Sequence, residues 1–380
     1  MSEEKYKKAA RIIVKAGFLP FPISDTLLEI SKLLINENEL DLIFAFKRQV
    51  SQTMEQLKKS SKMDVDEILK NIESLAKKGL IFDQPSSKGV MVYRLLPLLN
   101  VGVFEYTFMK KLEYSEKEKK FAILFEKLFS EYKDFVQDNY DSIVPFLQTM
   151  PPVDRTIPIV EKNVEGKDIE ISVNEELEAP QEEVLLAQNV EEIINKFDDI
   201  AVGFCYCRHH KDLLGDSCKI NAPRENCFTF GKSARFTTKQ GFARMVTKEE
   251  ALKILREAEE YGLVHKAFHP HSDIYKAETS ICNCCTCCCE TFDQFRKGAL
   301  PIINVTNYLS CVNPDLCIGC GTCIEKCPIG AISLNDENIA EVNDSYCIGC
   351  GICAHFCPET AISLLEGRRT VYIPPPRLKS

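Results

Sequence analysis

The sequence predicts an α+β protein of several domains. A chain of 380 residues is long enough for two or three separate cores. Helical spacing of apolar residues dominates its first part, which contains no cysteine, whereas all 19 cysteines lie from Cys205 onward. These cysteines fall in tight groups, and one group repeats after 30 residues. We therefore expect a mainly helical N-terminal domain followed by cysteine-rich domains of helices and short strands.

The first elements lie in residues 24–96. The apolar pattern predicts helices over 25–34, 40–46, 53–57 and 64–78, then strands over 80–82 and 90–93. Gly79 is placed to end the last helix, and the turn-rich segment 83–89 separates the two strands. This order resembles a winged-helix domain, which we place at residues 1–110.

A winged helix raises the question of DNA binding. Its recognition helix would be residues 64–78, and such helices use their N-terminal residues on the bases. Here those residues are Asp64, Asp66 and Glu67, which would face phosphates of like charge. Lys88 lies at the tip of the wing, so a contact between the wing and DNA phosphates stays an alternative. The sequence thus disfavours DNA as a partner and favours a docking surface or a homodimer contact.

The middle of the chain continues with helices. A helical pair over 115–147 forms a connector, residues 111–152. Residues 153–180 are expected to be extended, and a helix is predicted over 181–197. A helix over 248–261, which Thr247 caps, separates two groups of cysteines. We assign residues 153–312 to a central cysteine-rich α+β domain.

The strongest motif lies near the C-terminus. Four cysteines with the spacing C-x-x-C-x-x-C-x-x-x-C-P occur twice. They are Cys317, Cys320, Cys323 and Cys327, then Cys347, Cys350, Cys353 and Cys357. In this spacing the fourth cysteine ligates the other cluster. One cluster should therefore take Cys317, Cys320, Cys323 and Cys357, and the other Cys347, Cys350, Cys353 and Cys327. A structural zinc site would instead show two pairs of ligands.

Residues 313–365 resemble bacterial-type two-[4Fe–4S] ferredoxins. The resemblance rests on the two cysteine runs, each ending in Cys-Pro, and implies a ferredoxin-like dicluster domain at residues 313–367. It also implies one-electron transfer at low potential without substrate chemistry. Residues 368–380 are expected to form an extended tail.

Eleven further cysteines lie outside this motif. Cys311 stands alone, and six cysteines in the eight residues 282–289 are too many for one cubane, which takes four thiolates. The candidate metal ligands are Cys205, Cys207, Cys218, Cys227, Cys282, Cys284, Cys285, Cys287, Cys288 and Cys289. They could hold one or two more [4Fe–4S] clusters, or zinc, and each site could draw on both groups.

Polar residues accompany the central cysteines. Arg208, His209 and His210 either tune a cluster or form a polar loop. His265, His269 and His271 could ligate metal, but surface histidines are the expected interpretation with so many thiolates nearby. Residues 155–365 as a whole resemble archaeal and bacterial multi-cluster 4Fe–4S binding proteins, which implies an electron-transfer component and names no reaction.

The composition limits the function further. The net charge is −9, and residues after position 100 carry 43 Asp or Glu against 31 Lys or Arg. This acidic part suits docking onto a basic redox partner. No signal peptide or transmembrane segment is predicted, so we expect a cytoplasmic protein of a niche poor in oxygen.

The leading hypothesis is an iron–sulfur electron-transfer protein, or the electron-input subunit of an anaerobic oxidoreductase. The alternatives are an iron–sulfur redox-sensing transcriptional regulator and a reductase with a catalytic central cluster. The sequence identifies no catalytic residue.

Overall fold

The computed structural model describes residues 2–17, 19–86, 88–99, 101–152, 154–173, 189–270, 273 and 276–378. Contacts divide the chain into two compact units. The first contains residues 1–135, 203–216 and 234–244, and the second contains the remainder. The three domains, the connector and the tail expected from the sequence stay a prediction. None of the described helices is long and apolar enough to cross a membrane.

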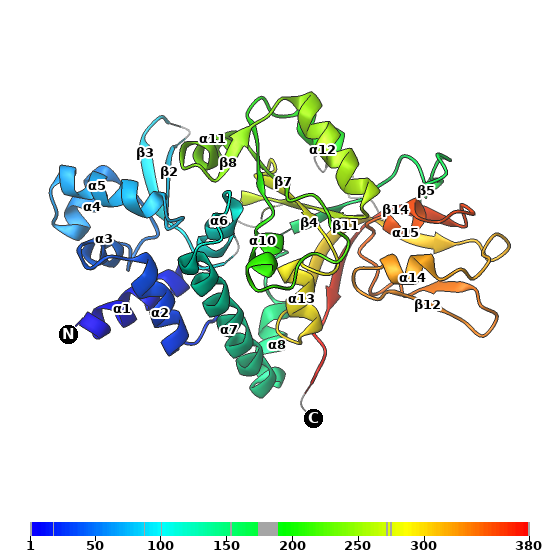
Figure 1. Ribbon diagram of the computed structural model, residues 1–380, viewed down its shortest axis with the longest axis horizontal. Helices are drawn as coiled ribbons and strands as arrows, with labels where there is room; N and C mark the ends of the chain where they lie inside the picture. The colour runs from blue at the N-terminus through cyan, green and yellow to red at the C-terminus, as the bar shows by residue number, and fades with distance from the viewer. Residues whose placement is uncertain are drawn as a thin grey trace. The chain divides into compact units, whose positions relative to one another are not determined.

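The first unit begins with helices and a small sheet (Figure 1). Its elements are α1 (Ser2–Lys15), α2 (Asp25–Leu34), the 3₁₀ helix η1 (Glu37–Glu39), α3 (Leu40–Ala45), β1 (Ser51–Thr53), α4 (Met54–Ser61), α5 (Val65–Ala76), β2 (Ile81–Pro85) and β3 (Met91–Leu95). The strands form an antiparallel sheet in the order β1-β3-β2. The Asp64 side chain accepts a hydrogen bond from the Glu67 N–H and so begins α5, and Gly79 has a φ of +73°.

Three further helices in this unit are held together by aromatic rings. They are α6 (Val103–Met109), α7 (Glu116–Asp138), whose last residues belong to the second unit, and α10 (Tyr206–Leu213). The Phe104 ring centroid lies 5.1 Å from that of Phe125 and 5.2 Å from that of His210. A ring nitrogen of His210 also lies 3.0 Å from the Ala122 carbonyl oxygen. Arg208, His209 and His210 are therefore buried in a helix, and the interpretation of this segment as a polar loop is wrong.

The second unit is built on a mixed β-sheet. The strands are β4 (Asp154–Ile157), β5 (Ile171–Val173), β6 (Ile200–Phe204), β7 (Glu225–Phe230), β9 (Val264–Phe268), β10 (Ser280–Cys284), β11 (Ile302–Val312) and β14 (Ile362–Ile373). They lie in the order β5-β14-β11-β4-β9-β10-β7-β6. The β11–β4 and β14–β5 pairs are parallel, whereas β11–β14, β4–β9, β9–β10 and β10–β7 are antiparallel. Helix α11 (Gly231–Lys239) and the short strand β8 (Ala243–Met245) belong mostly to the first unit.

Helices α9 (Val190–Asn195) and α12 (Lys248–Glu260) contribute to the apolar core on one face of this sheet. The core includes Ile193, Leu255 and, from the strands, Phe228 and Ile281. Helix α12 begins as predicted, because the Thr247 hydroxyl accepts a hydrogen bond of 3.2 Å from the Glu250 N–H. The predicted helix over 181–197 is described only from residue 189 onward, since its first part lies outside the described residues.

The remaining elements are α8 (Tyr140–Gln148), α13 (Glu290–Arg296), α14 (Thr322–Lys326), β12 (Ile332–Leu334), β13 (Ala340–Val342) and α15 (Ile352–His355). Helices α14 and α15 and the β12–β13 hairpin lie beyond the ends of β11 and β14 (Figure 1). Strand β14 continues to Ile373, so the expected tail begins later than residue 368. Beyond the strand, the Tyr140 hydroxyl donates to the Pro375 carbonyl, and Arg377 pairs with Asp141 at 2.7 Å.

Candidate metal centres

The two C-terminal cysteine runs line two separate cavities. The first has an empty volume of about 380 Å³. Its thiols, which we call the outer quartet, are Cys317, Cys320, Cys323 and Cys357. The second has an empty volume of about 310 Å³. Its thiols, the inner quartet, are Cys327, Cys347, Cys350 and Cys353. Each cavity thus combines three cysteines of one run with the fourth cysteine of the other, which is the chemistry that a thiolate-bound cubane requires.

Backbone N–H groups point at these sulfurs in both halves of the repeat. The Ala331 N–H donates to Cys327 at 3.2 Å, and the equivalent Ala361 N–H donates to Cys357 at 3.3 Å. The inner quartet has an additional partner, because the Ser310 hydroxyl oxygen lies 3.1 Å from the Cys353 sulfur. Such contacts stabilise thiolate ligands and tune the potential of a bound cluster. The cavities therefore fit the cofactor in donor type and in surroundings.

The two quartets differ in exposure. Cys320 is exposed, and hydrogen bonding to Thr322 lowers the pKa of its thiol. In the inner quartet, by contrast, Cys347, Cys350 and Cys353 are all buried. Burial raises the pKa of the Cys353 thiol to about 12. The outer quartet thus reaches the protein surface at Cys320, whereas the inner quartet, with three buried cysteines and the half-buried Cys327, is less exposed.

Two glycines of the inner loop explain this burial. A Cβ atom on Gly351 would lie 2.2 Å from the Ile159 carbonyl oxygen, and one on Gly349 would lie 2.1 Å from the Tyr308 carbonyl oxygen. The equivalent of Gly351 in the first repeat is Gly321, where a Cβ atom would meet nothing within 4 Å. The inner loop therefore packs directly on backbone of the central sheet region. In the outer loop a Cβ atom on Gly319 would instead meet the carbonyl oxygen of Asn338, which lies between β12 and β13.

The surface beside the outer quartet is apolar with an acidic rim. Ile318 is 65% exposed and Leu316 is 47% exposed, and the two lie two residues apart beside Cys317. Asp315 before Leu316, Glu325 in α14 and Glu359 after Cys357-Pro358 are also exposed, and Glu359 lines the outer cavity. We call these two apolar and three acidic residues the outer face.

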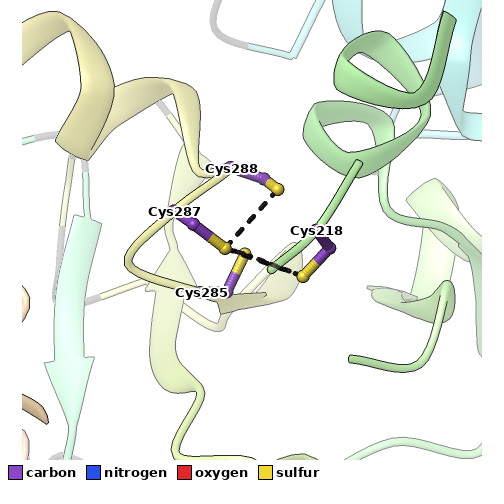
Figure 2. A group of neighbouring side chains, drawn as sticks. All are labelled: Cys218, Cys285, Cys287 and Cys288. Carbon is purple, nitrogen blue, oxygen red and sulfur yellow. Dashed lines mark hydrogen bonds between the residues drawn. The ribbon is translucent and has the colours of Figure 1, made fainter. Parts of the chain in front are cut away.

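The central cysteines separate into groups that the sequence did not resolve. Cys218 meets Cys285, Cys287 and Cys288, and these four, the central quartet, have sulfurs within 4.8 Å of one another. Figure 2 shows the sulfurs turned toward a common centre from two segments far apart in the sequence. Cys218 therefore lies with the later block, as the interleaved alternative allows.

A second group of thiols lies on the other face of β10. Because side chains alternate along a strand, Cys282 and Cys284 point away from the core residue Ile281. The Cys284 pKa is raised well above its ordinary value by a hydrogen bond to Cys289 and by burial. Cys227 lies on β7 one residue beyond the registered pair Phe228–Ile281, next to Cys282.

A buried cation accompanies this second group. Lys266 is the registered partner of Cys282, and its ammonium lies 2.6 Å from an Asp154 carboxylate oxygen. Burial alone would lower the Lys266 pKa, but Asp154 and the thiols of Cys284 and Cys289 raise it above its ordinary value. The sequence analysis missed both residues. Residues 264–268 and 280–284 show no clear alternation of apolar and polar residues that would mark them as strands, and no sequence signal points to Asp154.

The other candidates occupy different places. Cys205 directly precedes α10 in the first unit, and Cys207 lies in that helix; both are buried. Cys311 is exposed on β11. His265 and His269 are buried, so the expectation of surface histidines is wrong for them. His265 contacts Asn283 and Glu259, and His269 contacts the Lys276 carbonyl, whereas His271 lies outside the described residues.

Comparison with known proteins supports the C-terminal motif. Residues 310–364 match the family described as the 4Fe-4S dicluster domain. A probable ferredoxin of Methanosarcina thermophila is 64% identical over 31 residues, which cover 8% of this chain and 53% of that protein. The translation initiation factor rli1 of Schizosaccharomyces pombe is 48% identical over 40 residues, or 10% of this chain and 7% of that factor.

The chain therefore spans about half of the first of these curated relatives and a small part of the second. No solved structure matches the chain. The similarity establishes a ferredoxin-type 4Fe–4S dicluster domain in the C-terminal part. The winged-helix resemblance of residues 24–96 has no support from these comparisons.

Proposed function

We propose that the chain is a one-electron carrier that receives or delivers electrons at its outer face and connects them to the central cysteine region. When bound, the two [4Fe–4S] clusters supply reversible one-electron chemistry at low potential. The observation that carries the proposal is the difference in exposure between the quartets. Cys320 lies at the surface beside the exposed Ile318, whereas the inner quartet is buried against the central sheet region.

The chain's own residues have distinct tasks in this proposal. The quartets hold the clusters, and Ser310 and the Ala331 and Ala361 N–H groups stabilise the ligand sulfurs. The backbone around Ile159 excludes water from the inner loop. The proposed ligand sets are the outer and inner quartets as defined above.

The outer face supports a docking role with a basic redox partner. Its apolar centre, Leu316 and Ile318, could be covered by a partner, and its carboxylates would attract positive charge before contact. Both a free carrier and the electron-input subunit of an anaerobic oxidoreductase would need such a face.

We propose that the second central group is the part of the central cysteine region with which the inner quartet exchanges electrons. Cys282, Cys284 and Cys289 lie beside the buried Lys266, whose charge would compensate an anionic thiolate cluster. One central [4Fe–4S] cluster raises the iron content from about 8 to about 12 per chain. A content near 8 in the intact chain, with no other redox metal, would refute the connection to the central region.

The N-terminal helices and the β1-β3-β2 sheet suit an interaction platform of winged-helix type. Asp66 and Glu67 are exposed in the first turn of α5, which disfavours DNA contact there. We retain a docking or dimer contact as the proposed role of this region.

The docking proposal is tested by reducing the holo-protein with two one-electron reductants of opposite charge. The probes are the methyl viologen radical cation and the dithionite-derived sulfur dioxide radical anion. Replacing Glu325 and Glu359 with glutamine should slow reduction by the cation and weaken its salt dependence, and should not slow the anion. The matched control is the same pair of substitutions at the exposed Glu29 and Glu55 of the first unit. Equal effects of both pairs would refute the assignment of the outer face.

A further inference from the structure

The spacing of the central quartet differs from that of the two ferredoxin quartets. The sulfur–sulfur distances are 3.9 Å for Cys218–Cys285 and 3.7 Å each for Cys218–Cys287, Cys285–Cys287 and Cys287–Cys288. Four thiolates around a single tetrahedral metal ion with bonds of about 2.3 Å have sulfurs about 3.8 Å apart. The central quartet therefore has the dimensions of a mononuclear site.

The outer and inner quartets provide an internal comparison. In the part of the chain that the structure describes, no other three Cys, His, Asp or Glu side chains have ligand atoms within 4.8 Å of one another. All eight ferredoxin thiols belong to that described part, so their sulfurs stand farther apart around their cavities. A cubane needs this wider spacing, because each thiolate binds a different iron atom at the outside of the cluster.

The surroundings of the central quartet also suit a closed metal site. Cys218, Cys285 and Cys288 are at most 7% exposed and pack with the apolar residues Ala258 and Leu263. Backbone N–H groups of Ala222 and Lys219 donate hydrogen bonds to the sulfurs of Cys218 and Cys287, and such contacts are common around metal-bound sulfurs. All four cysteines are free thiols, so no disulfide explains their proximity.

We infer that Cys218, Cys285, Cys287 and Cys288 bind one tetrahedral metal ion, Zn²⁺ or Fe²⁺, and not a [4Fe–4S] cluster. Both ions accept four thiolates in this geometry. The ion would fix the loop that carries Cys218 to the turn at residues 285–288, two segments 67 residues apart at Cys218 and Cys285. The site does not depend on the proposed electron-transfer role, because no electron needs to reach it.

The test compares metal and sulfide content of the full chain purified without oxygen. Cys287→Ser removes a ligand that is only partly buried, and Cys311→Ser is the matched control at an exposed cysteine outside every group. Elemental analysis and acid-labile sulfide are measured on both variants and on the unaltered chain. We expect Cys287→Ser to lose one zinc or one iron per chain with no loss of sulfide, and Cys311→Ser to lose neither.

Loss of zinc and loss of iron each support the site and identify its ion. Loss of about four irons together with sulfide would overturn the inference in favour of a cubane. A metal content equal to that of Cys311→Ser would overturn it as well. As a second measurement, Co²⁺ added during expression should give the charge-transfer and d–d absorption of a tetrahedral four-thiolate ion in the control. If the control variant Cys311→Ser lacks those bands, the site is contradicted. This result does not depend on whether Cys287→Ser folds well.

Discussion

Replacing Gly351 with alanine should remove the inner cluster, whereas the same change at Gly321 should not. The two glycines occupy equivalent positions in the repeat and have φ values of +72° and +76°. Both substitutions therefore carry the same cost of about 1–2 kcal/mol for an L-residue in the left-handed region. Only Gly351 has a neighbour there, since its Cβ would lie 2.2 Å from the Ile159 carbonyl oxygen.

The difference between the two variants follows from that overlap. Relieving it requires the Ile159 backbone to move by about an ångström, and such overpacking costs about 1–3 kcal/mol. The Ile159 N–H also donates to the Cys350 carbonyl at 3.1 Å, next to a ligand of the inner quartet. Loss of that hydrogen bond adds about 0.5–1.5 kcal/mol. We therefore expect Gly351→Ala to destabilise the second unit by about 2–4 kcal/mol more than Gly321→Ala.

The assay is iron and acid-labile sulfide per chain, together with chemical denaturation under anaerobic conditions. Gly351→Ala should lose about four irons, one cluster, and unfold at lower denaturant. Gly321→Ala should keep its full iron content. Equal iron content and equal stability in the two variants would refute the reasoning that the inner loop, and not the outer one, is packed against the central backbone.

Three other outcomes follow from the structure. Ser310→Ala should lower the potential of the inner cluster by about 20–65 mV, the equivalent of one hydrogen bond, and an unchanged redox titration would contradict the contact to Cys353. Lys266→Met should cost about 3–5 kcal/mol of stability because it leaves Asp154 buried without its partner; adding Asp154→Leu should restore part of it, and no restoration would argue against this pair. Burial lowers the pKa of His269, so the unfolded state binds its proton more readily; stability should therefore fall as pH drops through about 6.5, and His269→Gln should flatten that slope.

The helices were the most predictable part of the fold. Apolar spacing and capping residues placed α2, α5 and α12 within two residues of their observed bounds. The central sheet was not predicted. Strands β9 and β10 contain buried histidine, lysine, asparagine and cysteine side chains, so they lack the continuous apolar run that marks a buried strand.

The candidate sites show the same contrast. The ferredoxin ligands follow from local spacing, because each loop of the motif carries three of its cluster's four cysteines. The central quartet joins Cys218 to Cys285 across 67 residues, and that meeting depends on the path of the chain through the second unit. The spacing of neighbouring residues does not predict such long-range contacts, so the sequence alone left the ligand sets of the central cysteines open.

The account rests on a dicluster domain with an exposed outer cluster and a buried inner one. Its most direct test is electron paramagnetic resonance of the full chain during an anaerobic redox titration. We predict signals that integrate to about two spins per chain for this domain at low potential, with splitting from two neighbouring reduced clusters. Magnetic interaction with an added surface-confined paramagnetic ion should broaden one of the two signals more than the other. A single spin per chain in this domain, or equal broadening of both signals, would contradict the account.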